Sequence, residues 1–332
     1  MTLSKIFLIA VALFSLAIPV WAVELVKGEN LVELHFLLQL RRVDFGQSHT
    51  SINNEGQVYS GFIAKRGEIR LEGSLNEENL RWGIMLDPIG LSNKITQDAY
   101  ISLEYIPFFN IKMGQFKYPQ NLDGRTSNAK LIMIERSILG RTFGTKRDLG
   151  IEFSYNHKYF EYALGLVNGS GQNNPENNDK KDWVARVLAK PVPYISLGGS
   201  IYRGRQPSGI TQRTAAEVKF NYKNFILQSE YQVGKDSSLE RWGVYLQASY
   251  QVGNIVQPCL RGEIWEPGKN NLKDKKSIIT GGINFFLKGE STKISFNYFL
   301  VTEETNETDN NSNSEIKSQA GSAGVGCQRS PE

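Results

Sequence analysis

Apolar and polar residues alternate with a period of two along most of this chain. In residues 31–43, Leu34 and Phe36 share one parity, whereas Glu33 and Gln39 share the other. Because successive side chains of a strand point to opposite faces, the pattern predicts β-strands with one apolar and one polar face. Comparable segments are predicted at residues 58–75, 80–87, 96–106, 110–117, 148–156, 159–168, 182–190, 194–204, 213–222, 224–234, 240–251, 254–265, 276–288 and 291–302, with a weaker one near Ser314.

The connections between these strands alternate in length. A long connection at 44–57 is followed by a tight turn at 76–79, a loop at 88–95, a turn at 107–109 and a very long loop at 118–147. Short turns on one side and longer loops on the other are typical of outer-membrane barrels. The expected fold class is all-β, a transmembrane antiparallel up-and-down β-barrel of about 16 strands. A soluble β-sandwich with a shared apolar core is the alternative.

The first 22 residues differ from the rest of the chain. Lys5 precedes an apolar run from Ile6 to Ile18, and the segment ends in the small residue Ala22. An uncleaved anchor helix is the alternative, but Pro19 interrupts a run that is shorter than the roughly 20 residues of a helical span. Residues 1–22 are therefore expected to be a secretory signal peptide, which implies export of the mature chain.

The C-terminal end is unusual for such a barrel. The last strand of an outer-membrane barrel usually ends in an aromatic residue, but no Phe, Tyr or Trp follows Phe299. The expected organisation is a β-barrel domain over residues 23–320, with the loop at 118–147 as its constriction. Residues 321–332 are expected to be an atypical C-terminal tail.

Composition and charge narrow the classes of function. The 332 residues have a mean hydropathy of −0.35, and two cysteines are too few for a disulfide framework. The formal net charge is +4, and the body of the chain is more basic than this total because acids gather after residue 302. A basic body indicates an anionic partner, and export argues against nucleic acid.

The sequence contains no recognisable catalytic, metal-binding or nucleotide-binding motif, so no enzyme activity, cofactor or metal is expected. An outer-membrane lipase is the enzymatic alternative, and it would need a Ser–His pair at the lipid-facing surface. His35 lies on the polar parity, His49 in the first long loop and His157 in a tight turn. None of the three is placed for that chemistry.

The loop at 118–147 is too long to be a simple connection. Its apolar residues Ile132, Met133 and Ile134 need a buried environment. This need favours a loop that folds into the pore over the alternative of a solvated external loop. Inside the pore, the cations of the loop would form an electrostatic filter for anions. The predicted anion-binding residues of this constriction are Lys117, Arg125, Lys130, Arg136, Arg141, Lys146 and Arg147.

The polar parity of the strands would line the lumen. Arg41, Arg66, Arg70 and Lys112 are the expected lumen-lining cations, and acids such as Glu68 share their parity. The lumen wall is therefore expected to be mixed in charge.

Selectivity is expected to depend on the loop. Neutralising Arg136 and Lys130 should shift selectivity toward cations if the loop lines the constriction, whereas changing Lys180 and Lys181 should do little.

The segment around the loop resembles a known family. The run from Ile111 to Tyr155 reads IKMGQFKYPQNLDGRTSNAKLIMIERSILGRTFGTKRDLGIEFSY, and the segments AKRGEIRLEGSL and DAYISLEY precede it. GQFK with Pro119, ERS at 135–137, and RD at 147–148 with Gly150 are its most specific features. These residues resemble the phosphate-selective porin O and P family. The resemblance implies a sixteen-stranded trimeric porin that passes small anions, with phosphate or polyphosphate as the substrates of some members.

The expected function is an outer-membrane channel for passive diffusion of small solutes with a preference for anions, including phosphate or polyphosphate as candidates. The expected location is the outer membrane of a Gram-negative bacterium. The expected partners are small inorganic anions, outer-membrane lipid and further copies of the chain in a homotrimer. The alternative is a structural or adhesive barrel that binds a ligand through loops such as 168–182, without selective transport.

Overall fold

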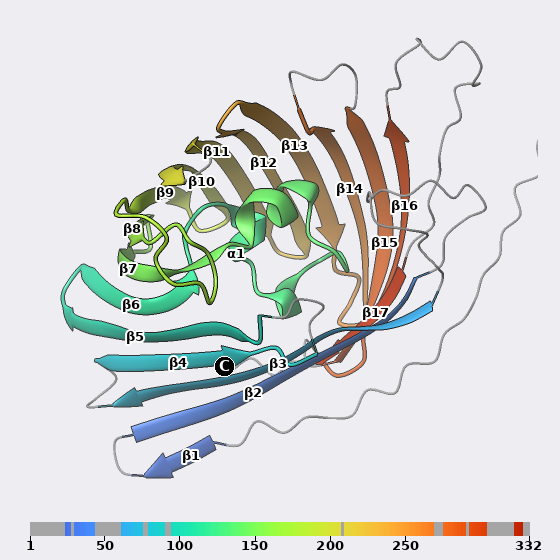
Figure 1. Ribbon diagram of the computed structural model, residues 1–332. Helices are drawn as coiled ribbons and strands as arrows, with labels where there is room; N and C mark the ends of the chain where they lie inside the picture. The colour runs from blue at the N-terminus through green and yellow to red at the C-terminus, as the bar shows by residue number, and fades with distance from the viewer. Residues whose placement is uncertain are drawn as a thin grey trace, which may run out of the picture.

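The structure is a computed structural model, and it describes residues 24–27, 30–43, 61–75, 79–89, 94–206, 209–268, 275–289, 292–303 and 322–327. The expected signal peptide and the connection at 44–57 lie outside these residues. The described strands form a 17-stranded antiparallel sheet that curves around a central loop (Figure 1). The predicted all-β up-and-down architecture is confirmed.

Most strands begin and end within three residues of the positions expected from the alternation. The bounds are β1 Glu24–Lys27, β2 Asn30–Val43, β3 Gly61–Leu75, β4 Leu80–Leu86, β5 Thr96–Ile106, β6 Phe109–Lys117, β7 Arg147–Asn156, β8 Phe160–Val167, β9 Asp182–Val192, β10 Ile195–Gln206, β11 Gly209–Tyr222, β12 Phe225–Asp236, β13 Leu239–Tyr250, β14 Val256–Glu266, β15 Lys276–Phe286, β16 Thr292–Glu303 and β17 Ser322–Cys327.

The first and last described strands, β1 and β17, both pair with β2. β17 pairs with β16 on one side and with β2 on the other, so every strand from β2 to β17 has two neighbours. Its contact with β2 is short and runs from Ser322, opposite Val43, to Val325, opposite Leu40. β1 pairs with residues 30–33 of β2 in the same antiparallel sense. The N-terminal and C-terminal strands therefore both pair antiparallel with β2.

The last described strand, β17, does not begin where the sequence pattern predicted a last strand. The weak sixteenth strand was expected from about Ser314, which lies outside the described residues. β17 instead begins at Ser322, inside the segment 321–332 that the sequence indicated as a tail. Its sequence, SAGVGC, carries little of the alternation that marks the other strands, because small residues occupy both parities.

Alternation along each strand separates an outer from an inner face. On β9, Trp183 and Val187 are exposed, whereas Asp182 and Arg186 on the other parity are buried. The same inversion occurs on β11, where Val218 is exposed beside the buried Glu217. Apolar side chains outside and charged side chains inside are typical of a barrel with lipid around it and polar groups within.

Exposed aromatic residues gather where the strands meet their short turns. Tyr105, Phe108, Tyr159, Tyr194 and Tyr222 are all exposed at such turns. Several contact one another: the ring centroids of Tyr194 and Tyr222 are 5.4 Å apart. A belt of this kind is typical of the membrane interface at one rim. Among the described residues, no helix has the length and apolar character to cross a bilayer.

The closing strand provides a test of the architecture. Gly324 pairs with Ser295 of β16 and with Arg41 of β2. Gly324→Pro removes a backbone donor from this ladder, and each such bond contributes about 1 kcal/mol net. We expect the temperature at which the folded form converts to the unfolded form in SDS gels to fall. Asp179→Pro, in an exposed loop, is the matched control; equal thermal resistance of the two variants would contradict the pairing of β17.

Candidate functional site

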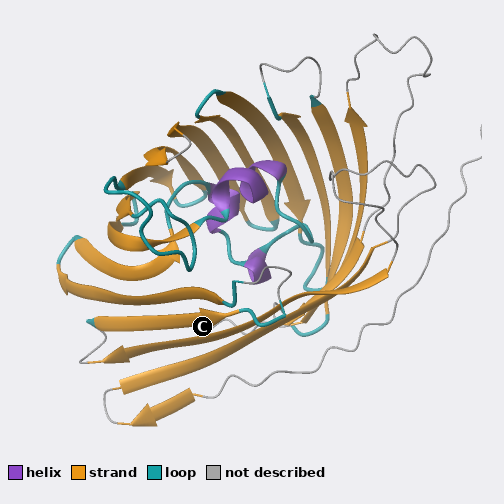
Figure 2. Ribbon diagram, viewed as in Figure 1, coloured by secondary structure: helices purple, strands orange, loops and turns teal. Residues whose placement is uncertain are grey.

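The long connection between β6 and β7, residues 118–146, lies inside the curve of the sheet (Figure 2). This inner loop contains three short helices: α1 Leu122–Arg125, η1 Asn128–Lys130 and η2 Gly140–Gly144. It bonds to strands as far apart around the sheet as β3 and β12. A segment that reaches strands so widely separated must cross the interior, so the predicted folding of the third long loop into the barrel is confirmed.

The start of α1 is attached to the wall by one carboxylate. The amides of Leu122 and Asp123 donate to the two oxygens of Glu230 at 2.6 and 3.0 Å. Tyr245 donates to the same carboxylate at 2.9 Å. The first amides of a helix have no partner within it and favour a negative charge. Glu230 on β12 satisfies both needs, although it is buried.

The middle of the inner loop is attached through its backbone. Amide, carboxylate and cationic side chains of β14, β15 and β16 bond to its N–H and C=O groups, which need a partner when they are buried. The bonds are Ile134 N–H to Asn297 at 2.8 Å, Ile138 N–H to Glu263 at 2.7 Å, Asn284 Nδ2 to Ile132 O at 2.9 Å, Lys293 Nζ to Leu131 O at 2.6 Å and Arg261 Nη1 to Glu135 O at 2.9 Å.

Apolar packing holds the other end of the loop. Leu139 and Phe143 are fully buried against Tyr245 and Trp265 of the wall, and the rings of Phe143 and Trp265 meet edge to face at 5.6 Å. Met133 is also buried, as the apolar character of this segment indicated. The loop is therefore part of the packed interior, where its position is set by both polar and apolar contacts.

Arg136 has a structural place in the loop. Its side chain is 2% exposed, and its guanidinium donates to the carbonyls of Asp123 and Thr126 and, at 2.8 Å, to the side chain of Asn128. Burial lowers the pKa of this guanidinium to about 10, although Asp123 opposes the shift. Arg136 is one of the predicted anion-binding residues, but its guanidinium donates to carbonyls of the loop.

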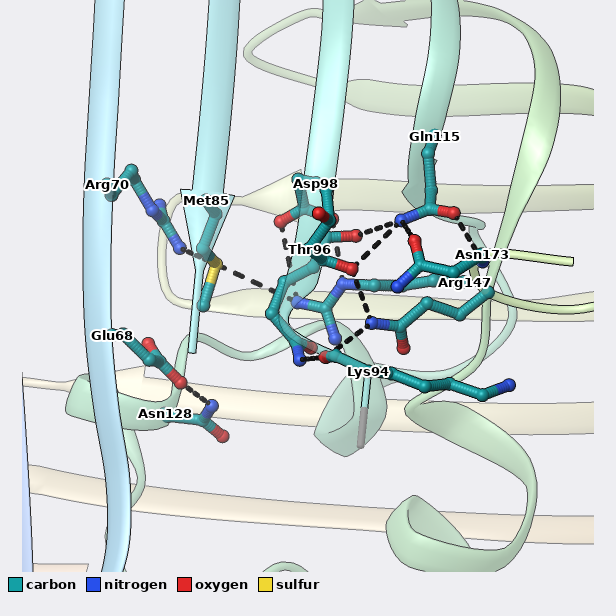
Figure 3. A network of polar contacts seen from close by, with 12 residues as sticks. Glu68, Arg70, Met85, Lys94, Thr96, Asp98, Gln115, Asn128, Arg147 and Asn173 are labelled. Atoms are coloured by element: carbon teal, nitrogen blue, oxygen red, sulfur yellow. Dashed lines mark hydrogen bonds and ion pairs between the residues drawn. The ribbon is translucent and has the colours of Figure 1, made fainter. Parts of the chain in front are cut away.

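Two of the expected loop cations belong to the flanking strands. Lys117 is the last residue of β6, and Arg147 is the first residue of β7. Figure 3 shows Arg147 among side chains of neighbouring strands, where it pairs with Asp98 at 2.8 Å and approaches the sulfur of Met85 at 3.9 Å. Arg147 is thus engaged in the wall.

The remaining loop cations differ in their surroundings. Lys130, Arg141 and Lys146 are exposed, and within the described part of the chain none of them forms an ion pair. Arg125, at the end of α1, lies 4.0 Å from Glu161. The loop therefore has three exposed cations without an ion-pair partner among the described residues.

The expected lumen-lining cations all have polar partners. Arg41 bonds to Glu135 of the loop and Arg66 to Gln39. Arg70 lies 3.5 Å from Glu72, and Lys112 lies 3.4 Å from Glu152. The wall elsewhere follows the same rule: Arg186 bonds to Glu217 and, at 2.8 Å, to Glu161. The wall is therefore mixed in charge. The expected lumen-lining cations have polar partners, whereas Lys117 at the end of β6 forms no ion pair within the described residues.

Glu135 is the point at which loop and wall charges meet. Besides Arg41, Lys65 of β3 lies 3.1 Å from its carboxylate. Burial opposes ionisation of Glu135, but attraction to Lys65, Arg41 and Arg66 outweighs it and lowers the pKa to about 2. Glu135 is therefore ionised at every physiological pH.

A second loop, residues 168–181, is hydrogen-bonded to the wall at the end of the sheet that carries the long loops. Gln115 and Asn173 exchange two hydrogen bonds of 2.8 Å (Figure 3). Gln172 donates to Thr96 O at 2.6 Å. The Gly171 amide donates to Asp148 at 3.0 Å. This Asn-rich loop bonds to β5, β6 and β7 and is held against their ends.

Two of the three histidines of the sequence lie in described parts of the chain. His35 Nε2 lies 3.0 Å from Glu33 on β2, His157 lies in the turn between β7 and β8, and His49 is outside the described residues. Over the ranges that the structure covers, no three His, Cys, Asp or Glu side chains are grouped to hold a metal ion.

The wall residues that hold the loop were not among the predicted site residues. They are chiefly Glu230, Glu263, Asn284 and Asn297. A signal was present, because all four lie on the polar parity of their strands. Their pairing with loop amides could not be read from that parity, because it depends on which strand faces which part of the loop.

Known proteins share this architecture. An uncharacterized protein of Aquifex aeolicus (strain VF5) is 24% identical over 355 residues, which cover 83% of this chain and 84% of that protein. The anion-selective porin from Comamonas acidovorans superposes with a TM-score of 0.62 at 15% identity, covering 90% of this chain and 98% of that one. The trimer form of OmpT, an outer membrane protein of Vibrio cholerae, superposes with a TM-score of 0.61 at 9% identity, covering 90% and 99%.

Because the sequence identities to these solved structures are low, the structural similarities establish the barrel fold alone. The family assignment comes from the sequence itself. The family described as phosphate-selective porin O and P matches residues 42–255, which is more than half of the chain. This chain therefore belongs to the phosphate-selective porin O and P family.

Proposed function

We propose that this porin is a channel of the outer membrane for passive diffusion of small solutes, with a preference for anions. The observation that carries the proposal is the inner loop, which crosses the interior and presents Lys130, Arg141 and Lys146 without ion-pair partners. Charges in a narrow, partly desolvated passage act on ions more strongly than charges in bulk water. The expected passage lies between this loop and the wall of β4–β9.

The paired wall supports a filter that resides in the loop. Pairs such as Lys112 with Glu152 have little net charge at a distance, so they contribute little to selectivity. The excess of positive charge comes from the loop cations, together with Lys117 at the end of β6. Phosphate and polyphosphate are candidate substrates, because ammonium and guanidinium groups are strong donors to phosphate oxygens and because of the family to which the chain belongs.

We also propose an assembly and a location for this porin. We infer export by the signal peptide at residues 1–22, insertion into outer-membrane lipid and assembly as a homotrimer. Support comes from the trimer form of OmpT, an outer membrane protein with the same fold, and from the apolar outer face with its aromatic rim.

The channel itself is tested in planar bilayers. Purified protein should give stepwise conductance, with a reversal potential in a KCl gradient that favours chloride over potassium. Replacing chloride by phosphate in the same experiment measures whether phosphate passes. No conductance steps, or a preference for potassium, would refute the proposal.

The location of the filter is tested in the same recordings. The double variant Lys130→Gln, Arg141→Gln removes two exposed loop charges, and we expect the chloride-to-potassium permeability ratio to fall by about twofold or more. Lys180→Gln with Lys181→Gln, in the exposed loop between β8 and β9, is the matched control. Equal shifts in both double variants would place the filter elsewhere.

Arg136 should behave differently from these cations. Arg136→Gln leaves buried carbonyls of the loop without donors, at a cost of about 1–3 kcal/mol. We therefore expect a lower unfolding temperature and unsteady, noisy conductance levels from a loosened loop. Lys130→Gln should change selectivity with steady levels, and indistinguishable recordings from the two single variants would contradict the structural place of Arg136.

The ion pairs of Glu135 give a pH dependence of known sign. Because its pKa is lowered to about 2, from about 4.3 in an unfolded chain, its contribution to stability is complete above the higher value. The contribution is lost as the pH falls toward the lower value. Single-channel conductance should thus be steady from pH 8 to about pH 5 and change only at stronger acidity. Glu135→Gln should lack its share of this acid transition; a wild-type transition that the variant retains in full would contradict the assignment.

A further inference from the structure

A cavity of about 160 Å³ opens on the inner face of β3, β4, β5 and β6. It lies beside the network of Figure 3, on the wall side of the expected passage. Its polar lining comes from three cations and two carboxylates, and its apolar lining from two aromatic rings, Ile84 and Met85. The side chains that matter to its chemistry are Arg70, Glu72, Asp98, Tyr100, Lys112 and Lys117, with Phe116 and Met85.

The apolar side of this cavity is built around a glycine. A Cβ atom on Gly83 would lie 2.7 Å from the ring of Tyr100. The glycine therefore allows the tyrosine ring to lie directly against β4. Phe116 and Tyr100 belong to one apolar cluster of the wall, and the Lys112 ammonium lies 5.2 Å from the centre of the Tyr100 ring and 5.8 Å from that of Phe116. Two aromatic rings thus flank one cation at the cavity.

The carboxylates of the cavity have cation partners. Glu72 lies 3.5 Å from Arg70, and Asp98 lies 2.8 Å from Arg147. Lys112 is in turn paired with Glu152 at 3.4 Å. Lys117 also lines the cavity, and within the described residues its ammonium forms no ion pair. Protonated Lys117 therefore gives the cavity a local excess of one positive charge beside an aromatic surface.

We propose that this cavity is a binding site for a small aromatic monocarboxylate, with the carboxylate at Lys117 and the ring against Tyr100 and Phe116. The proposal deepens the proposed channel function, on which it rests, because the cavity would be a stopping point for organic anions along the passage. An apolar cavity of about 150 Å³ holds benzene, so the volume matches a single aromatic ring.

The lining favours this ligand over inorganic phosphate. Aromatic surface offers phosphate no hydrogen bond, whereas ring contacts add favourable energy beyond the area that they bury. One uncompensated ammonium matches one carboxylate, and its charge-assisted hydrogen bond is among the stronger polar contacts in proteins. A saturated carboxylate such as acetate would keep the charge contact and lose the ring contacts.

The experiment measures binding of benzoate to the full-length protein in detergent by titration calorimetry, with acetate and phosphate as comparison ligands. We expect saturable benzoate binding at least about tenfold tighter than acetate or phosphate. Lys117→Gln should weaken benzoate binding about tenfold or more. Tyr100→Leu should weaken benzoate binding and leave acetate binding unchanged, which a general loss of folding would not do.

Lys180→Gln, a lysine substitution in an exposed loop, is the matched control and should bind benzoate like the parent protein. Benzoate binding that is no tighter than that of acetate, or that survives Lys117→Gln, would overturn the inference. The binding assay does not require conduction, and benzoate-free bilayer recordings are made in parallel. Conducting protein that does not bind benzoate refutes the site alone, whereas protein that binds benzoate and does not conduct refutes the channel.

Discussion

Pairing of every backbone N–H and C=O group away from bulk water is the constraint on which this structure depends. In a bilayer, a strand can meet it only through neighbours on both sides, and the strands from β2 to β17 each have two. The inner loop faces the same demand without a ladder of its own. Its amides and carbonyls are satisfied by Glu230, Glu263, Asn284 and Asn297 of the wall. One constraint thus shapes both the sheet and the loop inside it.

This arrangement also determines which charged side chains remain without an ion-pair partner. The carboxylates that hold the loop accept hydrogen bonds from its backbone amides. Most other inner carboxylates pair with wall cations such as Arg186. Negative charge on the inner face is therefore largely compensated, whereas Lys130, Arg141 and Lys146 on the loop are not. The residues that position the loop and the residues proposed to act on ions are different sets, so each set can vary with limited effect on the other.

Much of the fold was predictable because its signals are local. Alternation in segments such as Ile151–Tyr155 reports two faces of one strand, and the apolar run at 132–134 reports a loop that needs burial. The weak alternation of SAGVGC hid the last strand, since small side chains mark neither face. Among the candidate site residues, Lys130 and Arg141 are exposed on the loop, whereas Arg136 is buried among carbonyls that only the folded loop brings together.

The amino-acid sequence by itself determined the strand pattern, the parity of the lumen-facing charges and the presence of a basic loop with an apolar centre, because each depends on residues close together in the chain. Only the tertiary structure decided which cations are compensated and which wall residues hold the loop. The contacts of Glu230 with α1 and of Glu135 with Arg41 join residues about a hundred positions apart. Such contacts depend on the curvature and register of the whole sheet, which no local pattern encodes.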